Sequence, residues 1–535
     1  MRAWFLRLSV GIATIALGFC PAYSQSVPAT EAIAAPDSAE LLERLNAAEQ
    51  RIADLEAANG AATASDTGIA AVSDGTASED ASSEGDQSGE TDDAASKQVD
   101  DLTKRLEDLQ KEWDKHQEAL EEAASEAEKK PTFETGGRIH LDYWDFLQDS
   151  EGIEHFEHPD PDDAQFGTDP ESRFEFRRVR LEFEGDVPDL MFWRMQLDFN
   201  EPREPQMKDV YLGWKLPYNQ SLIVGHHKRP LGLDHYNSSR FNVFAERPLA
   251  VEAFNQDTRR LGVSLNGYTD DVLFHWRQGV YESQQIQDEG GYVGDSLQLG
   301  WYGRVGSTPW YDETSGGRGY LHLGLAGAVA RPDGDVTDAD SNANQARFRT
   351  RPQARTDSRW LDTGAIDGAE WFEHVGVETV VNVGSLQFVG EYITAWVQRD
   401  TTTLGTGPDT FFHGGYVYAS YFLTGEYMPW DRETGTLDRV KPLENFFLID
   451  QCTGGAGGGW GAWQLKARYD YLDLTDADVR GGVGNAVTFG MNWWWNPYAR
   501  VQFDVSRGLI EQHREVGGFD SGDYWLAGTR FAVDF

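Results

Sequence analysis

The 535-residue sequence has very little cysteine, with only Cys20 and Cys452. Cys20 falls at the end of an apolar N-terminal stretch, and Cys452 sits in a glycine-rich segment without His or Cys at metal-ligand spacing. One remaining cysteine cannot form an internal disulfide. We therefore expect no disulfide framework and no metal site, and we expect no cofactor.

Long hydrophobic runs are also missing beyond the N-terminus, which excludes a later transmembrane helix. Arg2 and Arg7, a short apolar stretch at 8–19, and the small-x-small triplet at 22–24 predict that residues 1–24 are a secretory signal peptide. The mature chain should then begin at Gln25. If it enters a membrane, it must do so as a closed β-barrel, because only helices and closed barrels satisfy every backbone group in hydrocarbon.

Catalytic motifs and positive charge are scarce. The sequence contains no Gly-x-Ser-x-Gly elbow, no phosphate loop and no His-Glu-x-x-His pair, so we expect no enzyme. It has 46 Lys and Arg against 89 Asp and Glu, a net charge of −43, which disfavours a nucleic-acid partner. Residues 131–535 alone carry 35 basic and 62 acidic residues, a net charge of −27.

Before residue 131, two segments repeat apolar residues at alternating intervals of four and three. The first runs from Leu41 to Leu55 and the second from Val99 to Leu120. This heptad spacing predicts helices that associate through coiled-coil seams. Residues 60–96 between them have the small and acidic composition of a flexible linker. We expect residues 25–130 to form periplasmic coiled-coil segments joined by this linker; the alternative is a solvated single helix.

Beyond Phe133 the apolar residues alternate with polar ones, and aromatic residues are abundant although the mean hydropathy is −0.54. Each segment is close to the roughly 9–11 residues that a tilted strand needs to cross a membrane. The pattern predicts an all-β domain over residues 131–535, a closed sixteen-stranded antiparallel transmembrane β-barrel. The segments start near residues 136, 172, 191, 208, 221, 258, 272, 296, 319, 370, 386, 411, 460, 484, 499 and 522.

The connections between these segments alternate between short turns and long loops, as in outer-membrane barrels. The long loops fall at 147–171, 229–257 and 331–369. The connection 425–459 breaks the rule, because it is long but lies on the short-turn side. Either the strand count slips there, or this connection is a special element. A soluble sandwich or propeller is the alternative fold. Against it stand the even strand count, the absence of a blade repeat, and the alternation that continues to the terminal Phe535.

Several short motifs occur in an order that resembles the phosphate-selective porin O/P family of outer-membrane channels. They cover patches of residues 172–535. The resemblance implies a sixteen-stranded trimeric channel with loops folded into the pore, among them loop 229–257. The motifs are Phe176–Leu181 with Gly185, Val224–Leu233 with Glu246-Arg247, Tyr421–Glu426 with Arg439–Pro442, and Gly461–Trp463 with Arg468-Tyr469 and Leu472–Leu474.

Cations at the constriction decide whether a pore admits anions, and arginine suits oxyanions because its planar fork matches their geometry. The alternative for each inward cation is pairing with a carboxylate of the wall, which we expect for most of them. The family motifs point to Arg177, Arg178, Arg180, Lys228 and Arg229 as pore-lining residues, with the last two at the narrowest region. Alternation alone turns Arg138, Arg194, Lys466, Arg468 and Arg530 inward.

We therefore expect a passive outer-membrane porin for small ions and solutes, with phosphate or other anions as one option. The acidic net charge argues against simple anion selectivity unless the acids lie on distant loops, where salt screens them beyond roughly 8 Å. The second hypothesis is a structural anchor that ties the coiled coil to the cell wall. The expected partners are outer-membrane lipid, assembly machinery that reads Phe535, and two further copies in a homotrimer.

Overall fold

The computed structural model describes residues 46–47, 50–51, 89–188, 190–201, 203–255, 258–286, 298–332, 345–400, 407–450 and 456–535. The chain divides into two units, Met1–Glu128 and Lys129–Phe535. The expected signal peptide, most of the first heptad segment and residues 60–88 of the expected linker lie outside the described residues.

In the first unit, helix α3 spans Gly89–Glu128, so the second heptad segment is helical as predicted. Its heptad residues Leu102, Leu106 and Leu109 are partly buried. The helix begins earlier than expected, because residues 89–96 are helical rather than part of the linker. This stretch is rich in acids, which stabilise a helix N-terminus. Association of α3 with other helices stays a prediction.

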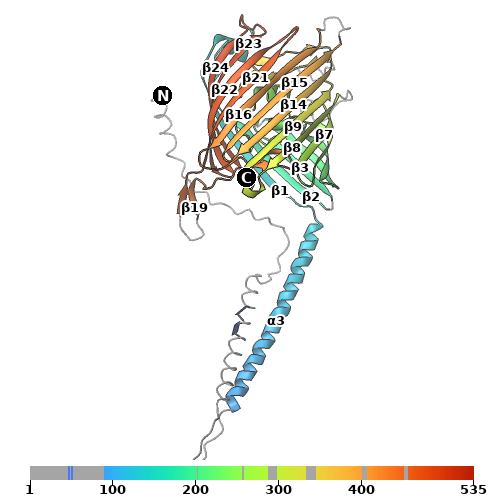
Figure 1. Ribbon diagram of the computed structural model, residues 1–535, viewed down its shortest axis with the longest axis vertical. Helices are drawn as coiled ribbons and strands as arrows, with labels where there is room; N and C mark the ends of the chain where they lie inside the picture. The colour runs from blue at the N-terminus through green and yellow to red at the C-terminus, as the bar shows by residue number, and fades with distance from the viewer. Residues whose placement is uncertain are drawn as a thin grey trace, which may run out of the picture. The chain divides into compact units, whose positions relative to one another are not determined.

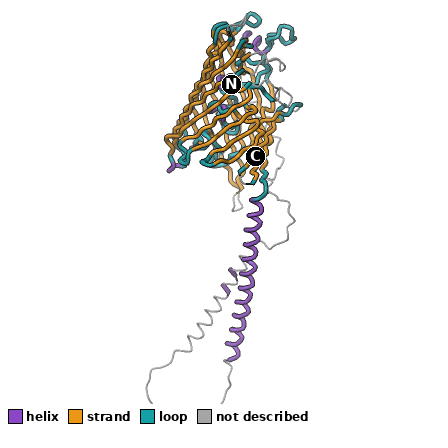
Figure 2. Tube along the Cα trace, turned by 90° about the vertical axis from the view of Figure 1, so that its right-hand side faces the viewer, coloured by secondary structure: helices purple, strands orange, loops and turns teal. Residues whose placement is uncertain are grey.

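The second unit is a closed barrel of sixteen antiparallel strands in sequence order, which confirms the predicted barrel (Figures 1 and 2). Every observed strand starts within five residues of its predicted start. The strands are β1 Glu134–Asp149, β2 Arg173–Val187, β3 Met191–Asp198, β4 Gln206–Leu216, β5 Gln220–Lys228, β6 Arg259–Tyr268, β7 Phe274–Glu282, β8 Leu299–Tyr311, β9 Gly319–Ala330, β14 Ala369–Val383, β15 Leu386–Arg399, β16 Thr410–Phe422, β21 Ala462–Asp476, β22 Val479–Asn496, β23 Ala499–His513 and β24 Gly522–Asp534.

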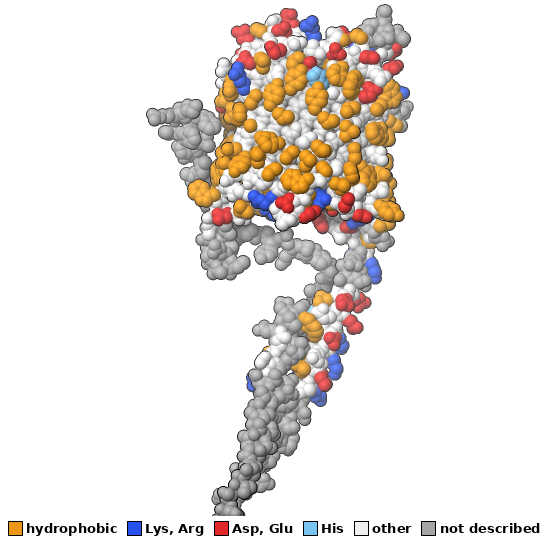
Figure 3. Space-filling view, in the orientation of Figure 1, with side chains coloured by type: hydrophobic (Ala, Val, Ile, Leu, Met, Phe, Trp, Pro, Cys, Tyr) orange, Lys and Arg blue, Asp and Glu red, His pale blue; other side chains and the backbone are white. Residues whose placement is uncertain are grey.

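The outer wall of the barrel is apolar. Outward residues such as Ile139, Leu323 and Phe489 are exposed, while their neighbours His140, His322 and Thr488 are buried inside. Figure 3 shows the outward residues as a hydrophobic band bordered by charged side chains at both ends of the barrel. None of the described helices is both long enough and apolar enough to cross a membrane.

Loops longer than twenty residues connect strands at one end of the barrel, whereas most connections at the other end are short turns. The exception is segment 423–461, which confirms that the long connection on the short-turn side is a real element. The short elements within the connections are α4 Glu151–Glu157, α5 Leu233–Tyr236, α6 Leu249–Phe254, η1 Glu313–Ser315, β10 Gln345–Ala346, β11 Arg349–Thr350, β12 Leu361–Asp362, β13 Ile366–Asp367, β17 Trp430–Asp431, β18 Thr436–Leu437, β19 Phe447–Asp450 and β20 Ala456–Gly459.

Loop 229–258 folds into the barrel rather than away from it. Its helix α6 contacts β15, β16 and β21, and Leu249, Val251 and Phe254 are buried there. Segment 423–461 also enters the barrel, where Trp430 is buried and its Nε1 donates to Thr308 Oγ1 at 3.2 Å. The two segments meet where Leu437 N donates to Asn237 Oδ1 at 3.1 Å. Both segments therefore occupy part of the lumen.

Candidate pore constriction

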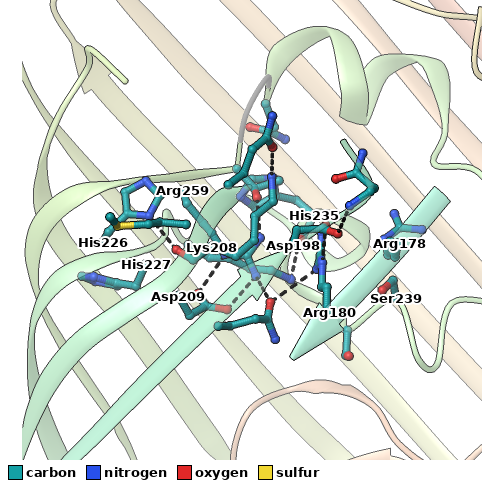
Figure 4. A pocket seen from close by; sticks show the side chains of 18 of the residues that line it. Arg178, Arg180, Asp198, Lys208, Asp209, His226, His227, His235, Ser239 and Arg259 are labelled. Carbon is teal, nitrogen blue, oxygen red and sulfur yellow. Dashed lines mark hydrogen bonds and ion pairs between the residues drawn. The ribbon is translucent and has the colours of Figure 1, made fainter. Parts of the chain in front are cut away.

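A cavity of about 380 Å³ lies between loop 229–258 and the wall formed by β1–β6. Figure 4 shows this cavity, with Arg178 and Ser239 at one side of the view and His226 and His227 at the other. Eleven basic side chains line it, against five acidic ones. The basic residues are Arg138, Arg177, Arg178, Arg180, Arg194, Lys208, Lys228, Arg247, Arg259, Arg355 and Arg359, and the acidic residues are Asp198, Glu201, Asp209, Glu246 and Glu252.

Three arginines of β2 point into this cavity although strict alternation would turn one of them to lipid. A β-bulge resolves the conflict: His140 pairs with Arg178 and Leu141 pairs with Phe176, so Arg177 is an extra residue without a partner on β1. A bulge adds one residue and restores the pattern beyond it. Arg177, Arg178 and Arg180 therefore all line the cavity, as the family motif implied.

Several of these cations are neutralised by wall or loop carboxylates. Arg180 Nε donates to Asp198 Oδ2 at 2.6 Å, and Arg259 Nη2 donates to Asp209 Oδ2 at 2.6 Å (Figure 4). Arg177 forms a two-pronged pair with Glu246 of the loop, at 2.7 and 3.0 Å. These pairs set the shape of the wall, and they show that an inward arginine is not by itself a binding group.

Other cations keep donors without a carboxylate. Arg178 is only 4% exposed, its Nη1 contacts His140 Nδ1 at 3.3 Å, and its Nε has no hydrogen-bond partner among the described residues. Arg138 Nη1 donates to the hydroxyls of Ser238 and Ser239 at 3.3 and 3.1 Å, although its Nη2 pairs with Glu182 at 3.4 Å. Arg355 and Arg359 form no ion pair within the described chain. Among the described residues, the cavity lining therefore carries more basic than acidic side chains.

The loop itself carries both signs of charge. Burial disfavours ionised Glu246, but the guanidiniums of Arg177 and Arg530 outweigh burial and hold the pKa of Glu246 well below its ordinary value. Burial, with Lys228 and Arg247 nearby, holds the pKa of His235 well below its ordinary value. Outside this loop, in the connection between β9 and β14, burial also lowers the pKa of Arg355, and the charge of neighbouring Arg177 lowers it further. Glu246 is thus ionised and His235 neutral at physiological pH.

Six of the ten predicted residues line the cavity, namely Arg138, Arg177, Arg178, Arg180, Arg194 and Lys228. Lys228 Nζ, however, is held by the backbone carbonyls of residues 235, 236 and 237 at 3.2, 2.9 and 2.9 Å. These carbonyls lie at the end of α5, where a cation is favourable. Lys228 therefore clamps the start of the loop.

The other four predicted residues lie away from the cavity lining. Arg229 packs on Tyr302, donating to its hydroxyl at 3.1 Å, so it is not placed at the narrow region as the sequence suggested. The other three cations bond loop 229–258 on the side away from the cavity. Lys466 Nζ donates to Val243 O at 2.9 Å, Arg468 Nη1 donates to Glu246 O at 2.9 Å, and Arg530 pairs with Asp142 at 2.6 Å and with Glu246 at 2.5 Å.

Several lining residues were not predicted from the sequence. Arg259 begins β6 beside Arg260, and Arg247 belongs to the Glu246-Arg247 motif. Arg355 and Arg359 belong to a loop with five arginines between residues 347 and 359. A count of arginines in otherwise acidic loops would have identified these two. No group of three or more potential metal ligands occurs among the described residues.

A closed barrel with an apolar outer belt, a polar lumen and inward-folded loops is the architecture of an outer-membrane channel for solutes. The family described as phosphate-selective porin O and P matches residues 133–514. An uncharacterized protein of Caulobacter vibrioides is 31% identical over 377 residues, which cover 68% of each chain. The chain belongs to the phosphate-selective porin O and P family.

Three solved outer-membrane proteins align with this chain at low sequence identity. OmpT of Vibrio cholerae is 13% identical, with a TM-score of 0.42 over 75% of this chain and 98% of that chain. An anion-selective porin from Comamonas acidovorans is 12% identical, with a TM-score of 0.40 over 75% and 100%. The channel DcaP of Acinetobacter baumannii is 12% identical, with a TM-score of 0.42 over 76% and 98%.

Proposed function

We propose that this outer-membrane channel passes small anions, phosphate among them, through the cavity beside loop 229–258. The observation that carries the proposal is the surplus of basic over acidic side chains in that cavity, where Arg178, Arg355 and Arg359 have no carboxylate partner among the described residues. Guanidinium groups suit oxyanions because their planar donors match two oxygens at once.

The acidic charge of the barrel segment does not oppose this proposal, because part of it lies in the connections at the two ends of the barrel. Residues 158–165, in the long loop between β1 and β2, and residues 312–317, in the short turn between β8 and β9, are two such acidic stretches. Charges separated by more than the Debye length, roughly 8 Å at physiological ionic strength, are largely screened. The cations that line the cavity beside loop 229–258 therefore dominate the field that an ion in this cavity experiences.

The test is conductance in planar bilayers, with reversal potentials measured under a salt gradient. Stepwise currents with anion preference are expected. A silent barrel would support the anchor hypothesis, and a conducting but cation-preferring barrel would overturn the anion assignment. Because the solute passes unchanged, we propose transport without catalysis.

We further propose that the channel is a homotrimer whose helices associate in the periplasm. The heptad spacing of Leu102, Leu106, Leu109, Trp113 and His116 on α3 supports self-association. A peptide of residues 97–130 should cross-link to trimers in solution. Finding only monomers at high concentration would refute self-association, and finding dimers would refute the trimer. We also propose that the signal peptide of residues 1–24 directs export of the protein. The periplasmic helices are proposed to contact the cell wall.

A further inference from the structure

An apolar groove of about 480 Å³ lies on the outer wall of the barrel, across β14, β15, β16 and β21. These four strands are neighbours in the sheet and face the viewer in Figure 1. The groove follows two adjacent rows of the strand register. One row contains Thr379, Gly390, Val417 and Tyr469, and the next contains Val377, Tyr392, Gly415 and Tyr471.

Two glycines form the floor of this groove. Gly390 of β15 and Gly415 of β16 occupy outward positions, and they lie diagonally next to each other because Gly390 pairs with Val417 and Gly415 pairs with Tyr392. Tyr392 and Val417 are 44% and 59% exposed, so their side chains stand out from the wall on either side of the glycines. The groove is therefore a gap in the apolar belt, which meets hydrocarbon in the membrane.

A second depression, of about 350 Å³, lies nearer the long-loop end of the same strands. It is lined by Glu373 of β14, by Trp396 and Gln398 of β15, and by Asp409. Gln398 Nε2 donates to Glu373 Oε1, and Arg399 N donates to Asp409 Oδ1 at 2.9 Å. Neither carboxylate forms an ion pair within the described chain, and no described lysine or arginine lines either depression.

The spacing of the two depressions matches one leaflet of a membrane. β15 passes through both of them, with Gly390 in the groove and Trp396 in the polar depression. These two residues are about 20 Å apart along the strand at roughly 3.3 Å per residue. For a strand tilted by about 40°, this is about 15 Å along the membrane normal, or half of a hydrocarbon core about 30 Å thick.

We propose that these two depressions bind one membrane lipid whose headgroup carries an ammonium group. An acyl chain lies in the groove over Gly390 and Gly415, and the ammonium lies between Glu373, Asp409 and Trp396. Carboxylates pair with an ammonium, and an aromatic face attracts it. A headgroup with phosphate and no ammonium would meet two carboxylates and no described cation. This proposal does not depend on the anion conduction proposed above.

The experiment measures lipid binding to the full-length folded protein by native mass spectrometry from detergent micelles. The probes are phosphatidylethanolamine and phosphatidylglycerol with identical acyl chains, because only the first carries an ammonium. Migration without heating checks that each barrel is folded.

Gly390→Leu fills the groove. A Cβ at Gly390 would lie 3.4 Å from Val417 Cγ1 and 3.6 Å from Tyr416 O, which are ordinary contacts, so the barrel should fold. Gly327→Leu is the matched control, because Gly327 also faces outward, on β9, and a Cβ there would meet only His374 O at 3.5 Å. Gly327 does not line the groove.

The headgroup is tested by Glu373→Gln combined with Asp409→Asn. Its control is Glu511→Gln, which removes an exposed carboxylate from β23, on another part of the wall.

The wild-type protein should bind phosphatidylethanolamine roughly fivefold more tightly than phosphatidylglycerol, as a partly exposed ion pair would allow. Gly390→Leu should weaken binding of both lipids roughly tenfold, which corresponds to lost contact with about two methylene groups. The double variant should remove the preference for phosphatidylethanolamine. Gly327→Leu and Glu511→Gln should match wild type.

Three results would overturn the lipid site. They are equal binding of the two lipids by the wild type, an equal effect of Gly390→Leu and Gly327→Leu, and a shift of Gly390→Leu from oligomers to monomers with lipid binding unchanged. The last result would mean that a second copy of the chain covers the groove. If Gly390→Leu does not fold, Thr379→Phe narrows the same groove from β14, and the same criteria apply.

Discussion

Arginine side chains in the lumen differ in function according to their partners. Arg177 and Arg178 are adjacent and both point inward, yet Arg177 is bound to Glu246, while Arg178 has His140 as its one side-chain hydrogen-bond partner among the described residues. A paired arginine helps to fix the shape of the barrel wall. It adds little charge to the pore, because the carboxylate cancels most of its field. An arginine without a carboxylate contributes charge to the pore. The residues that decide selectivity are therefore those whose donors are incompletely satisfied.

Replacing Arg178 with glutamine should reduce anion preference. One charge at about 4 Å contributes about 1 kcal/mol even in a water-like dielectric, so the anion-to-cation permeability ratio should fall roughly fivefold. Reversal potentials under a salt gradient measure the ratio. The control is Lys215→Gln, an exposed cation paired with Asp186 at the barrel rim, which should leave the ratio unchanged. Equal values for both variants would remove Arg178 from the permeation path.

Replacing Lys228 with methionine should loosen the constriction loop. The ammonium holds three carbonyls of the loop, and hydrogen bonds to a charged group contribute about 1.5–3 kcal/mol each. The free energy of unfolding should drop by about 3 kcal/mol or more, measured from the heating or denaturant midpoint of barrel migration. Lys215→Met should cost about 1 kcal/mol or less, since its ion pair is exposed. A Lys228→Met barrel as stable as the control would show that the clamp is dispensable.

At the scale of elements, loop 229–258 is bonded on both of its sides. Arg177 of β2 holds it from the cavity side, and Lys466 and Arg530 hold it from the opposite wall. A loop that is bonded to two walls cannot swing as a lid without breaking buried ion pairs. The loop is therefore fixed to two walls of the barrel, and the bulge in β2 supplies Arg177, which pairs with it.

Glu246 should keep this loop in place well into the acid range. Its folded pKa is depressed, so its contribution to stability is present above the unfolded value of about 4.3 and is lost only as pH falls through the folded value. The unfolding midpoint should stay flat from pH 7 to about pH 5 as far as this group is concerned. Glu246→Gln should lower stability by about 3–5 kcal/mol at pH 7, because Arg177 and Arg530 lose their shared partner.

The control for Glu246→Gln is Glu313→Gln, which removes an exposed carboxylate paired with Arg432. That variant should behave like wild type across the same pH range. If Glu246→Gln were as stable as wild type at pH 7, the ion pairs with Arg177 and Arg530 would not be what holds the loop.

For the whole molecule, closure of the barrel depends on the two ends of the second unit. β24 pairs with β1, and Phe535 continues this ladder, donating from its N to Gly137 O at 3.1 Å and accepting from Gly137 N at 2.8 Å. The aromatic ring is 62% exposed at the short-turn end. The last residue therefore both completes the wall and presents a free aromatic side chain.

Deleting Phe535 should block assembly in the outer membrane. The deletion removes the last two hydrogen bonds of the closing ladder and the terminal aromatic residue. The measurement is the amount of heat-modifiable barrel in isolated outer membranes, compared with Phe535→Tyr, which keeps an aromatic terminus and should assemble. Normal levels of folded barrel after the deletion would show that assembly does not require this residue.

The sequence alone determined the barrel wall. Alternation of polar and apolar residues reports which face of a strand meets lipid, and it located all sixteen strands. It also placed a long connection at 425–459, which the structure shows at 423–461. Polarity also identified Arg138, Arg194 and Arg530 as inward. These features follow from local period and spacing, because a strand that crosses hydrocarbon must repeat its pattern at every second residue.

Only the tertiary structure decided which inward cations reach the open cavity. Alternation distinguishes inside from outside, but it does not report that loop 229–258 divides the inside into two parts. Arg530 and Lys466 therefore lie behind the loop, while Arg178 and Arg355 lie before it. The pairing of each arginine depends on carboxylates far away in the sequence, such as Glu246 for Arg177. Contacts of this kind arise from packing across the lumen, which local sequence patterns do not encode.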